Sequence, residues 1–477
     1  MKHGRYSLIY QYFQSQIRFG YLKKGDTLPS IELLHEVHHA AVRTVRNAYL
    51  LLQEEGYICV SPGRNTEVIY DASPEQCLRD SQDYYLSRKE AFDVLNQTLK
   101  ILLIPLLREG AQRLQKHDMR LIKENAATLQ NGDFYISFFC GRQMLLSLKN
   151  RLALDLYYDI SSFYQFPHFL AWKVPIEGSS ARFQQLSSEA IAACENNDSN
   201  RLFHVYLSIQ DFLNETIQAY LSEAGQVRPV KEQVPFEWRV YRERPQICYS
   251  LAAQLIGMIL INQVYAPGDF LPSYHEMAKH FSVSLSTIRR MAELLEKLGI
   301  VTSIQGVGTQ VLPRKRKSPY LPPAAAQKIL AKCLEVIQII RISFDSIIQQ
   351  FFPKPKGKLE NCLRELRDLQ EEGASFRAFL TCLGYLFYGS DSNPLEAVWE
   401  KLYEILLLGL PIVEMQTADP NMAHRLSHCT GDLIQSLETQ QLELFRNNLN
   451  ELMILATAAA EKAFDLFKIA PKSFRQS

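Results

Sequence analysis

Apolar residues recur mostly at intervals of three and four along this 477-residue chain. That spacing is typical of amphipathic helices, in which every third or fourth side chain falls on one face. Short strands around glycine turns are expected only at residues 57–60 with 67–70 and at residues 300–304 with 310–312. The pattern therefore predicts a mainly α fold with two small β-ribbons.

Each ribbon follows three predicted helices, at residues 8–19, 31–38 and 42–54 and again at residues 251–261, 274–280 and 285–298. Pro-Ser precedes the second helix of each series, and serine is a preferred N-cap. Gly56 or Gly299 follows the third helix, where a left-handed C-cap favours glycine. Helix, helix, tight turn, helix, β-ribbon is the order of a winged helix-turn-helix.

The two series are copies of one pattern. Gly25-Asp26-Thr27-Leu28-Pro29-Ser30 returns as Gly268-Asp269-Phe270-Leu271-Pro272-Ser273, and the offset of 243 then holds for about forty residues without a gap. The helical stretches that follow the ribbons resemble one another more loosely. We infer an internal tandem duplication, in which two winged helix-turn-helix domains alternate with two all-helical domains.

This reading divides the chain into four parts. We expect a first DNA-binding domain at residues 1–72, a helical effector or dimerisation domain at 73–235, a second DNA-binding domain at 236–313, and a linker with a second helical domain at 314–477. The linker opens on Arg314-Lys315-Arg316-Lys317 and continues into prolines, so it is expected to be exposed. Whether it contacts the DNA backbone stays open.

Both copies resemble the DNA-binding domain of the GntR family of bacterial regulators. The shared pattern is Gly-Asp, Leu-Pro-Ser, a recognition helix with Thr-Val-Arg or Thr-Ile-Arg, then Leu-x-x-x-Gly and a Gly-x-x-Thr-x-Val wing. The resemblance covers roughly seventy residues per copy, and the combined spacing is more specific than any one element. It implies that the N-terminal residues of the recognition helix enter the major groove while the wing lies on the backbone.

That resemblance implies DNA contacts on the turns, recognition helices and wings of both copies. In the first copy these are Ser30, Arg43, Thr44, Arg46, Asn47, Gly63 and Arg64. In the second they are Ser273, His275, Ser286, Thr287, Arg289, Arg290, Gly306, Gly308 and Thr309. The family often carries two further arginines where this chain has Glu32 and Val42, or His275 and Leu285, so we expect a weaker or differently distributed base readout.

Composition limits the other interpretations. The net charge of +1 argues against a surface that is basic throughout and binds nucleic acid nonspecifically. Basic residues that contact DNA are therefore expected only at the recognition helices and wings. Nine scattered cysteines without a Cys-x-x-Cys pair indicate a reduced, cytoplasmic chain. We expect no signal peptide at the N-terminus, and the longest apolar run is too short to span a membrane.

Each winged helix-turn-helix domain is called a reader below. A GntR-type reader followed by a long helical domain weakly resembles the branch of the family called FCD, whose helical domain binds small acid or acyl ligands. The histidine that many such domains use for metal is replaced by Cys140 or Leu383, so no metal site of that type is expected. Aromatic-rich runs predict either plain core or a mostly apolar cavity for a small organic effector. The polar residues expected in such a cavity are Tyr135, Arg142, Tyr158, His204, Arg377 and Tyr403.

Two histidine motifs have spacings found in metal sites. His35-Glu36-Val37-His38-His39 matches a zinc-protease pattern, but it lies on the second helix of a reader and the second copy lacks it. His424 and His428 lie four apart on a predicted helix without a further partner. We therefore expect neither a metal nor a cofactor.

The leading hypothesis is a ligand-responsive transcriptional repressor without enzymatic activity, whose two readers bind a double-stranded operator as an intramolecular pseudo-dimer. Higher assembly stays open. A helical interaction or architectural protein with degenerate readers is the alternative. A GntR reader fused to a pyridoxal-phosphate enzyme is disfavoured, because the second reader interrupts the space that such a fold needs and no lysine-centred cofactor signature follows.

Overall fold

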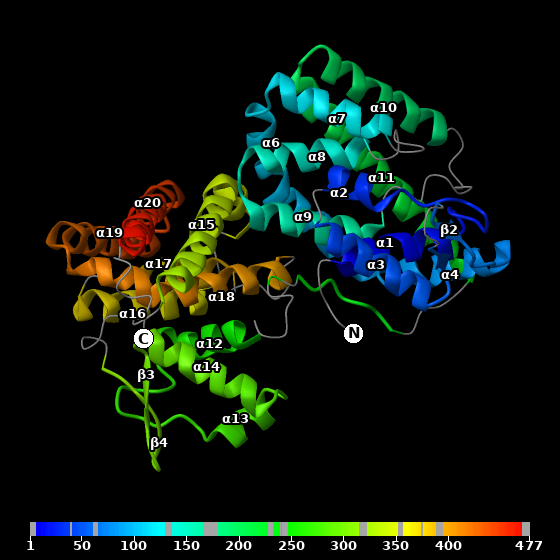
Figure 1. Ribbon diagram of the computed structural model, residues 1–477. Helices are drawn as coiled ribbons and strands as arrows, with labels where there is room; N and C mark the ends of the chain where they lie inside the picture. Colours follow the sequence, from blue (N-terminus) through cyan, green and yellow to red (C-terminus); the bar gives the residue numbers. More distant parts are fainter. Residues whose placement is uncertain are drawn as a thin grey trace. The chain divides into compact units, whose positions relative to one another are not determined.

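The structure, a computed structural model, describes residues 6–38, 41–60, 65–128, 136–165, 179–227, 232–238, 240, 247–313, 322–351, 356–373, 375–387 and 395–469. The chain forms two compact units, Met1–Trp238 and Arg239–Ser477 (Figure 1). Each unit begins with a small helical domain that ends in an antiparallel β-pair. Longer helices make up the rest of each unit.

The first reader consists of α1 (Tyr6–Arg18), α2 (Ile31–His38), α3 (Val42–Glu54), β1 (Ile58–Cys59) and β2 (Glu67–Val68). The second consists of α12 (Ile247–Ile256) with the π-helical segment η5 (Gly257–Ile261), α13 (Tyr274–His280), α14 (Leu285–Lys297), β3 (Val301–Ile304) and β4 (Gly308–Val311). The predicted second helices match these bounds, and the third match to within one residue. The predicted strands are longer than β1 and β2 by two residues each.

The repeated Gly-Asp motif builds the same turn in both readers. Gly25 and Gly268 have φ of 93° and 98°, a conformation in which a side chain would be strained. The Asp26 carboxylate accepts the Lys23 N–H at 2.7 Å, as the Asp269 carboxylate accepts the Ala266 N–H at 2.7 Å. The turn therefore depends on glycine for its backbone and on aspartate for its hydrogen bond.

The chain that leaves this turn pairs with the second strand of the wing. Leu28 N–H donates to the Thr66 carbonyl and Leu271 N–H to the Thr309 carbonyl, both at 2.8 Å. Isolated bridges join Thr27 to Glu67 and Phe270 to Gln310. Each of these hydrogen bonds recurs at the offset of 243, so the two readers share one backbone pattern.

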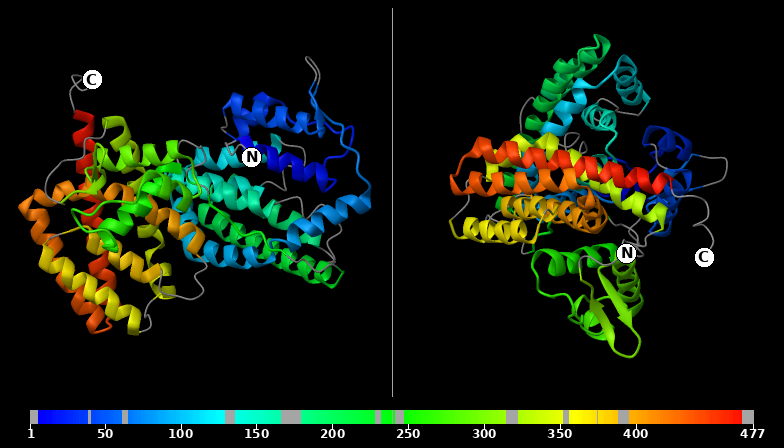
Figure 2. Two further views of the ribbon diagram at one scale, coloured as in Figure 1. Left: turned by 90° about the horizontal axis from the view of Figure 1, so that it is seen from below. Right: turned by 90° about the vertical axis from the view of Figure 1, so that its left-hand side faces the viewer.

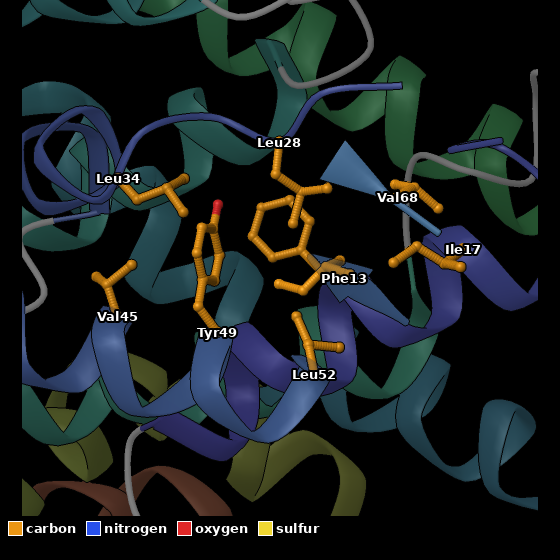
Figure 3. Packing of buried hydrophobic residues seen from close by; sticks show 9 residues of the cluster. Phe13, Ile17, Leu28, Leu34, Val45, Tyr49, Leu52 and Val68 are labelled. Atoms are coloured by element: carbon orange, nitrogen blue, oxygen red, sulfur yellow. The ribbon is translucent and has the colours of Figure 1, made fainter. Parts of the chain in front are cut away.

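A continuous apolar core holds the first reader together (Figure 3). Phe13 of α1 packs edge-on against Tyr49 of α3, with ring centroids 5.7 Å apart. The Tyr49 hydroxyl points out of the core and donates to the Pro29 carbonyl at 2.6 Å. The aromatic ring thus joins α1 to α3, while its hydroxyl fixes the segment that leads into α2.

The helical part of the first unit consists of α4 (Pro74–Leu86), α5 (Lys89–Thr98), the π-helical segment η1 (Leu99–Leu103), α6 (Ile104–Gln112), α7 (Lys116–Thr128), α8 (Ile136–Ser147), α9 (Arg151–Tyr164), α10 (Ser179–Glu195) and α11 (Ser199–Val227). That of the second unit consists of α15 (Pro323–Phe351), α16 (Lys356–Glu372), α17 (Arg377–Phe387), α18 (Glu396–Val413), the short 3₁₀ segment η6 (Glu414–Ala418), α19 (Pro420–Glu438) and α20 (Leu442–Ile469). The expectation of a mainly helical fold is confirmed.

The last two helices of each unit pack against one another, α10 on α11 and α19 on α20 (Figures 1 and 2). In both units the first helix of the reader contacts the helical part, α1 through α9 and α12 through α18. Among the described helices, none is long and apolar enough to cross a membrane.

The segment before residue 239 belongs to the first unit. Val234 N–H donates to the Ser87 carbonyl at 2.6 Å, and the Phe236 ring packs edge-on against Phe163. Trp238 is also buried. The division between units thus falls three residues later than the sequence boundary at 235, because these aromatic side chains complete the first core. The finer division into four domains stays a prediction.

Leu52→Ala is expected to destabilise the first reader by about 2–5 kcal/mol, because Leu52 is fully buried in the core and the truncation leaves a cavity. Leu50→Ala on the same helix is the matched control, since Leu50 is 48% exposed. Amide hydrogen exchange of peptides from α1 to α3 would measure both. Equal protection in the two variants would contradict this assignment of the core.

Candidate nucleic-acid interface

One face of α3 and α14 holds each reader together, and the other faces solvent. Val45, Ala48, Tyr49 and Leu52 are buried in α3, as are Ile288, Met291, Ala292 and Leu295 in α14. The intervening positions near the helix N-termini carry exposed polar side chains: Arg43, Arg46 and Asn47 on α3, and Ser286, Arg289 and Arg290 on α14. Thr44 and Thr287 are half-buried beside them. The exposed face is therefore basic where each helix begins.

Acidic residues lie at the other end of α14. Glu293 and Glu296 follow the arginines, and Lys297 lies 4.0 Å from Glu293. The positive end of the helix macrodipole is at the N-terminus, on the same side as Arg289 and Arg290. Charge and dipole together favour an anion such as a phosphate at the beginning of the helix.

Serine caps begin three of the four helices of the two helix-turn-helix pairs. The Ser30 hydroxyl accepts the Leu33 N–H at 3.1 Å, and Ser273 forms a capping box with Glu276. Ser284 caps α14 by accepting the Thr287 N–H at 3.2 Å. Its counterpart before α3 is Ala41, which has a similar backbone conformation and no side chain that can cap.

The wing of the second reader is a four-residue antiparallel pair that extends beyond α13 and α14 (Figure 2, right). Gly306 and Gly308 are exposed at its tip, with φ of 76° and 151°. A Cβ on Gly308 would lie 3.2 Å from the Phe270 ring, so the tip depends on glycine. Thr309 is a correction: its side chain is 5% exposed, because it points into the reader, and it is not placed for a side-chain contact with DNA.

His275 is exposed on α13, beside the capping serine. Three other expected site residues, Gly63, Arg64 and Tyr135, lie outside the described residues. His39, the last residue of the segment that matches the zinc-protease pattern, also lies outside the described residues. No group of three potential metal-binding side chains occurs within the described ranges.

Two of the effector residues expected in the first unit, Arg142 and Tyr158, lie together. Arg142 of α8 is buried, and its Nε donates to the Tyr158 hydroxyl of α9 at 3.1 Å. Its Nη2 has no hydrogen-bond partner among the described residues. His204 is a correction, because it is exposed on α11 and points away from the helical core.

The effector residues expected in the second unit lie where the reader meets the helical part. The Arg377 guanidinium of α17 is buried and contacts Glu372, the Ser375 hydroxyl at 3.1 Å and the Leu260 carbonyl of η5 at 3.3 Å. Arg377 therefore secures the reader rather than lining a cavity. Tyr403 of α18 donates to the Leu380 carbonyl at 3.3 Å and lines a cavity at this junction.

This junction cavity has a volume of 710 Å³. One wall is a single helical face of the reader, formed by Gln254, Gly257, Met258 and Ile261 of α12 and η5. The other walls come from α16, α17 and α18 and carry Lys358, Glu365, Tyr385, Glu400, Tyr403 and Glu404, together with smaller side chains. Cavities of this volume are in the range that small molecules occupy.

Glu404 links the two sides of the cavity. Its side chain is 4% exposed, accepts the Ser250 hydroxyl at 2.6 Å and Gln254 Nε2 at 3.3 Å, and pairs with Lys401 at 3.1 Å. This residue is not among those expected from the sequence. A carboxylate inside an otherwise apolar stretch of α18 was the available signal, because a buried charge requires partners.

Helix-turn-helix geometry, basic recognition helices and a β-wing define a winged helix-turn-helix DNA-binding protein. Residues 249–311 match the family described as "Bacterial regulatory proteins, gntR family". The uncharacterized HTH-type transcriptional regulator YhcF of Bacillus subtilis (strain 168) is 27% identical over 101 residues, 21% of this chain and 84% of YhcF. Residues 249–311 are thus similar to the DNA-binding helix-turn-helix domain of GntR-type transcriptional regulators.

Two solved structures are also similar. One, described as "Lar controls the expression of the Listeria monocytogenes agr system and mediates virulence", is 14% identical, with 46% of this chain and 97% of that chain covered and a TM-score of 0.22. The other, Streptococcus agalactiae GntR, is 15% identical, with coverages of 45% and 99% and a TM-score of 0.20. TM-scores this low do not establish a shared overall fold.

The two recognition helices give opposite predictions for their N-caps. Ala41→Ser should stabilise the first reader, because its backbone conformation matches that of the capping Ser284. Ser284→Ala should destabilise the second reader. Each change is expected to be about 1 kcal/mol, measured by amide hydrogen exchange in α3 and α14. Destabilisation by Ala41→Ser would show that the first recognition helix begins differently.

Proposed function

We propose that both readers contact DNA and that one chain fills one operator. The exposed arginines at the N-termini of α3 and α14 carry this proposal, because arginine is the commonest specific partner of bases and phosphates. The proposed contacts are those expected from the sequence, with Thr309 limited to its backbone. A single-reader protein needs a second copy to reach two half-sites, whereas this chain carries both readers covalently.

The half-sites should differ. The recognition segments read Arg43-Thr44-Val45-Arg46-Asn47 and Ser286-Thr287-Ile288-Arg289-Arg290, so the exposed side chains available to bases are not the same. An imperfect inverted repeat is therefore the proposed operator. We further propose that the protein represses transcription from this operator. An organic effector would bind without a metal and change the affinity for the operator.

We also infer that the two halves arose by tandem duplication. The shared hydrogen bonds of the readers at one sequence offset support this origin. So does the matching order of the helical parts, in which α7 to α11 follow one another as α16 to α20 do. The helix α4 has no counterpart among the described residues of the second unit.

Arg46→Ala and Arg289→Ala should each weaken binding to the selected operator by about 1–3 kcal/mol, because each removes an exposed guanidinium near a helix N-terminus. The double variant should retain only salt-sensitive nonspecific binding. Lys297→Ala, at the far end of α14, is the matched control. Fluorescence anisotropy on DNA selected from random sequence would measure all four, and unchanged affinity of the double variant would refute the assignment of the recognition helices.

Sedimentation of the complex with a minimal selected operator should show one chain per DNA. The reason is that two covalently linked readers can occupy two half-sites at the concentration set by their tether. The selected site should be asymmetric at its two ends. Two chains on the minimal operator, or a perfectly symmetric site, would reject the pseudo-dimer while leaving DNA binding itself intact.

A further inference from the structure

We propose that the junction cavity of the second unit binds an organic cation, an amine with an apolar body, and that this ligand controls the second reader. The inference rests on the proposed DNA-binding function and names the ligand class and the site. Its basis is the composition of the cavity walls, their charge, and the hydrogen bonds between those walls and the reader.

The reader supplies a wall of this cavity directly. Gln254, Gly257, Met258 and Ile261 follow the spacing of one helical face, so the ligand would touch the helix that packs against α14 (Figure 1). Gly257 leaves the space open, since even a Cβ there would come within 3.2 Å of Leu407. The wall is interrupted by the π-helical turn η5, and such turns are frequent at functional sites.

The charge of the cavity favours a cation. Its lining includes the carboxylates of Glu365, Glu400 and Glu404 but only one ammonium, that of Lys358. Lys401 lies behind the lining and pairs with Glu400 at 3.3 Å and with Glu404 at 3.1 Å. Glu365 forms no hydrogen bond or ion pair within the described part of the chain. The Glu365 side chain is exposed, but neighbouring atoms partly desolvate its carboxyl and raise its pKa, and a bound ammonium would offset that penalty.

Aromatic and apolar groups complete the site. Tyr385 and Tyr403 line it from α17 and α18, and the face of a tyrosine ring attracts an ammonium group. Met258, Ile261 and Leu407 offer apolar contact for the body of the ligand. Carboxylate, phosphate and nucleotide ligands would meet net negative charge here and are disfavoured.

Glu404 provides the connection to DNA binding. It accepts hydrogen bonds from Ser250 and Gln254 of α12 and also lines the cavity. A ligand ammonium that hydrogen-bonds to the Glu404 carboxylate competes with Ser250 and Gln254 for it. The affinity of the ligand therefore depends on how α12 is placed relative to Glu404. That difference in affinity is what a ligand needs to shift an equilibrium.

The first unit lacks these features at the matching reader positions. At the offset of 243, Gly257 corresponds to Gln14 and Ile261 to Arg18. Gln14 donates to the Tyr57 hydroxyl at 3.3 Å, and Arg18 pairs with Asp80 of α4 at 2.9 Å. Larger side chains committed to other partners thus replace the open wall, and the proposal is confined to the second unit.

The test compares three probes of matched shape, 4-phenylbutylamine, 4-phenylbutanol and 4-phenylbutyrate, by calorimetry on the full chain. The amine should bind in about the millimolar range or tighter. It should bind at least about tenfold more tightly than the carboxylate, since charged hydrogen-bond pairs are the strong ones. Equal or tighter binding of 4-phenylbutyrate, or no binding of the amine, would overturn the proposal.

Glu365→Gln should weaken amine binding about tenfold while leaving 4-phenylbutanol unchanged. Glu371→Gln, on the same helix outside the cavity, is the matched control. Gly384→Ala places a methyl group 3.6 Å from the Tyr403 hydroxyl and should weaken both probes. Full amine affinity in Glu365→Gln and Gly384→Ala would place the binding elsewhere and refute the site.

Operator binding measured with and without the amine tests the coupling. The amine should change operator affinity about fivefold, and Ser250→Ala should reduce that change without weakening amine binding. An unchanged response in Ser250→Ala would refute the role of Glu404. Failure of the ligand-free chain to bind any selected DNA would count against the proposed function, whereas intact DNA binding without amine binding would count against the cavity alone.

Discussion

The second unit depends on a helix that is apolar around most of its circumference. Six of the ten residues of α12 are buried: Cys248, Leu251, Ala252, Ala253, Leu255 and Ile256. A helix of this kind must be covered on more than one side. The recognition helix α14 covers one side and α18 covers another. The helix α12 therefore belongs to both cores and connects α18 to the recognition helix.

The contacts that attach the reader to the helical part differ between the two units. In the first unit, α1 keeps polar side chains such as Gln14 and Arg18, and the Arg18–Asp80 ion pair joins it to α4. The Arg18 side chain of this pair is 42% exposed and that of Asp80 is 11% exposed, so the pair is only partly shielded from water. In the second unit the attachment is a buried carboxylate and a buried guanidinium, Glu404 and Arg377. Breaking such buried polar contacts is costly, so the second attachment is the more specific of the two.

The sequence predicted the readers closely because local rules determine them. Gly-Asp specifies a turn, Ser30 and Ser273 specify caps, and glycines at 56 and 299 end the third helices with φ of 78° and 73°. The period of the apolar residues also identified the helical parts. Side-chain placement between distant helices was predicted less well: His204 proved exposed, Thr309 proved buried, and Arg377 proved to hold the reader.

The sequence predicted a cavity that contains Tyr403 but did not locate its other walls. These walls come from α12 with η5 and from the later helices α16, α17 and α18, and no single stretch carries their signature. Gly257 and Gly384 look like ordinary small core residues until a third helix places Leu407 or Tyr403 beside them. A site formed by tertiary contacts becomes visible only when those contacts are known.

The cavity of 710 Å³ is partly open to solvent, so water can occupy it when no ligand is bound. Glu404 joins α12 to α18, and Arg377 joins η5 to α17. One of these polar contacts, that of Glu404, lies at the cavity itself. Under the proposal above, a ligand that prefers one arrangement of this contact makes the position of α12, and with it α14, depend on occupancy.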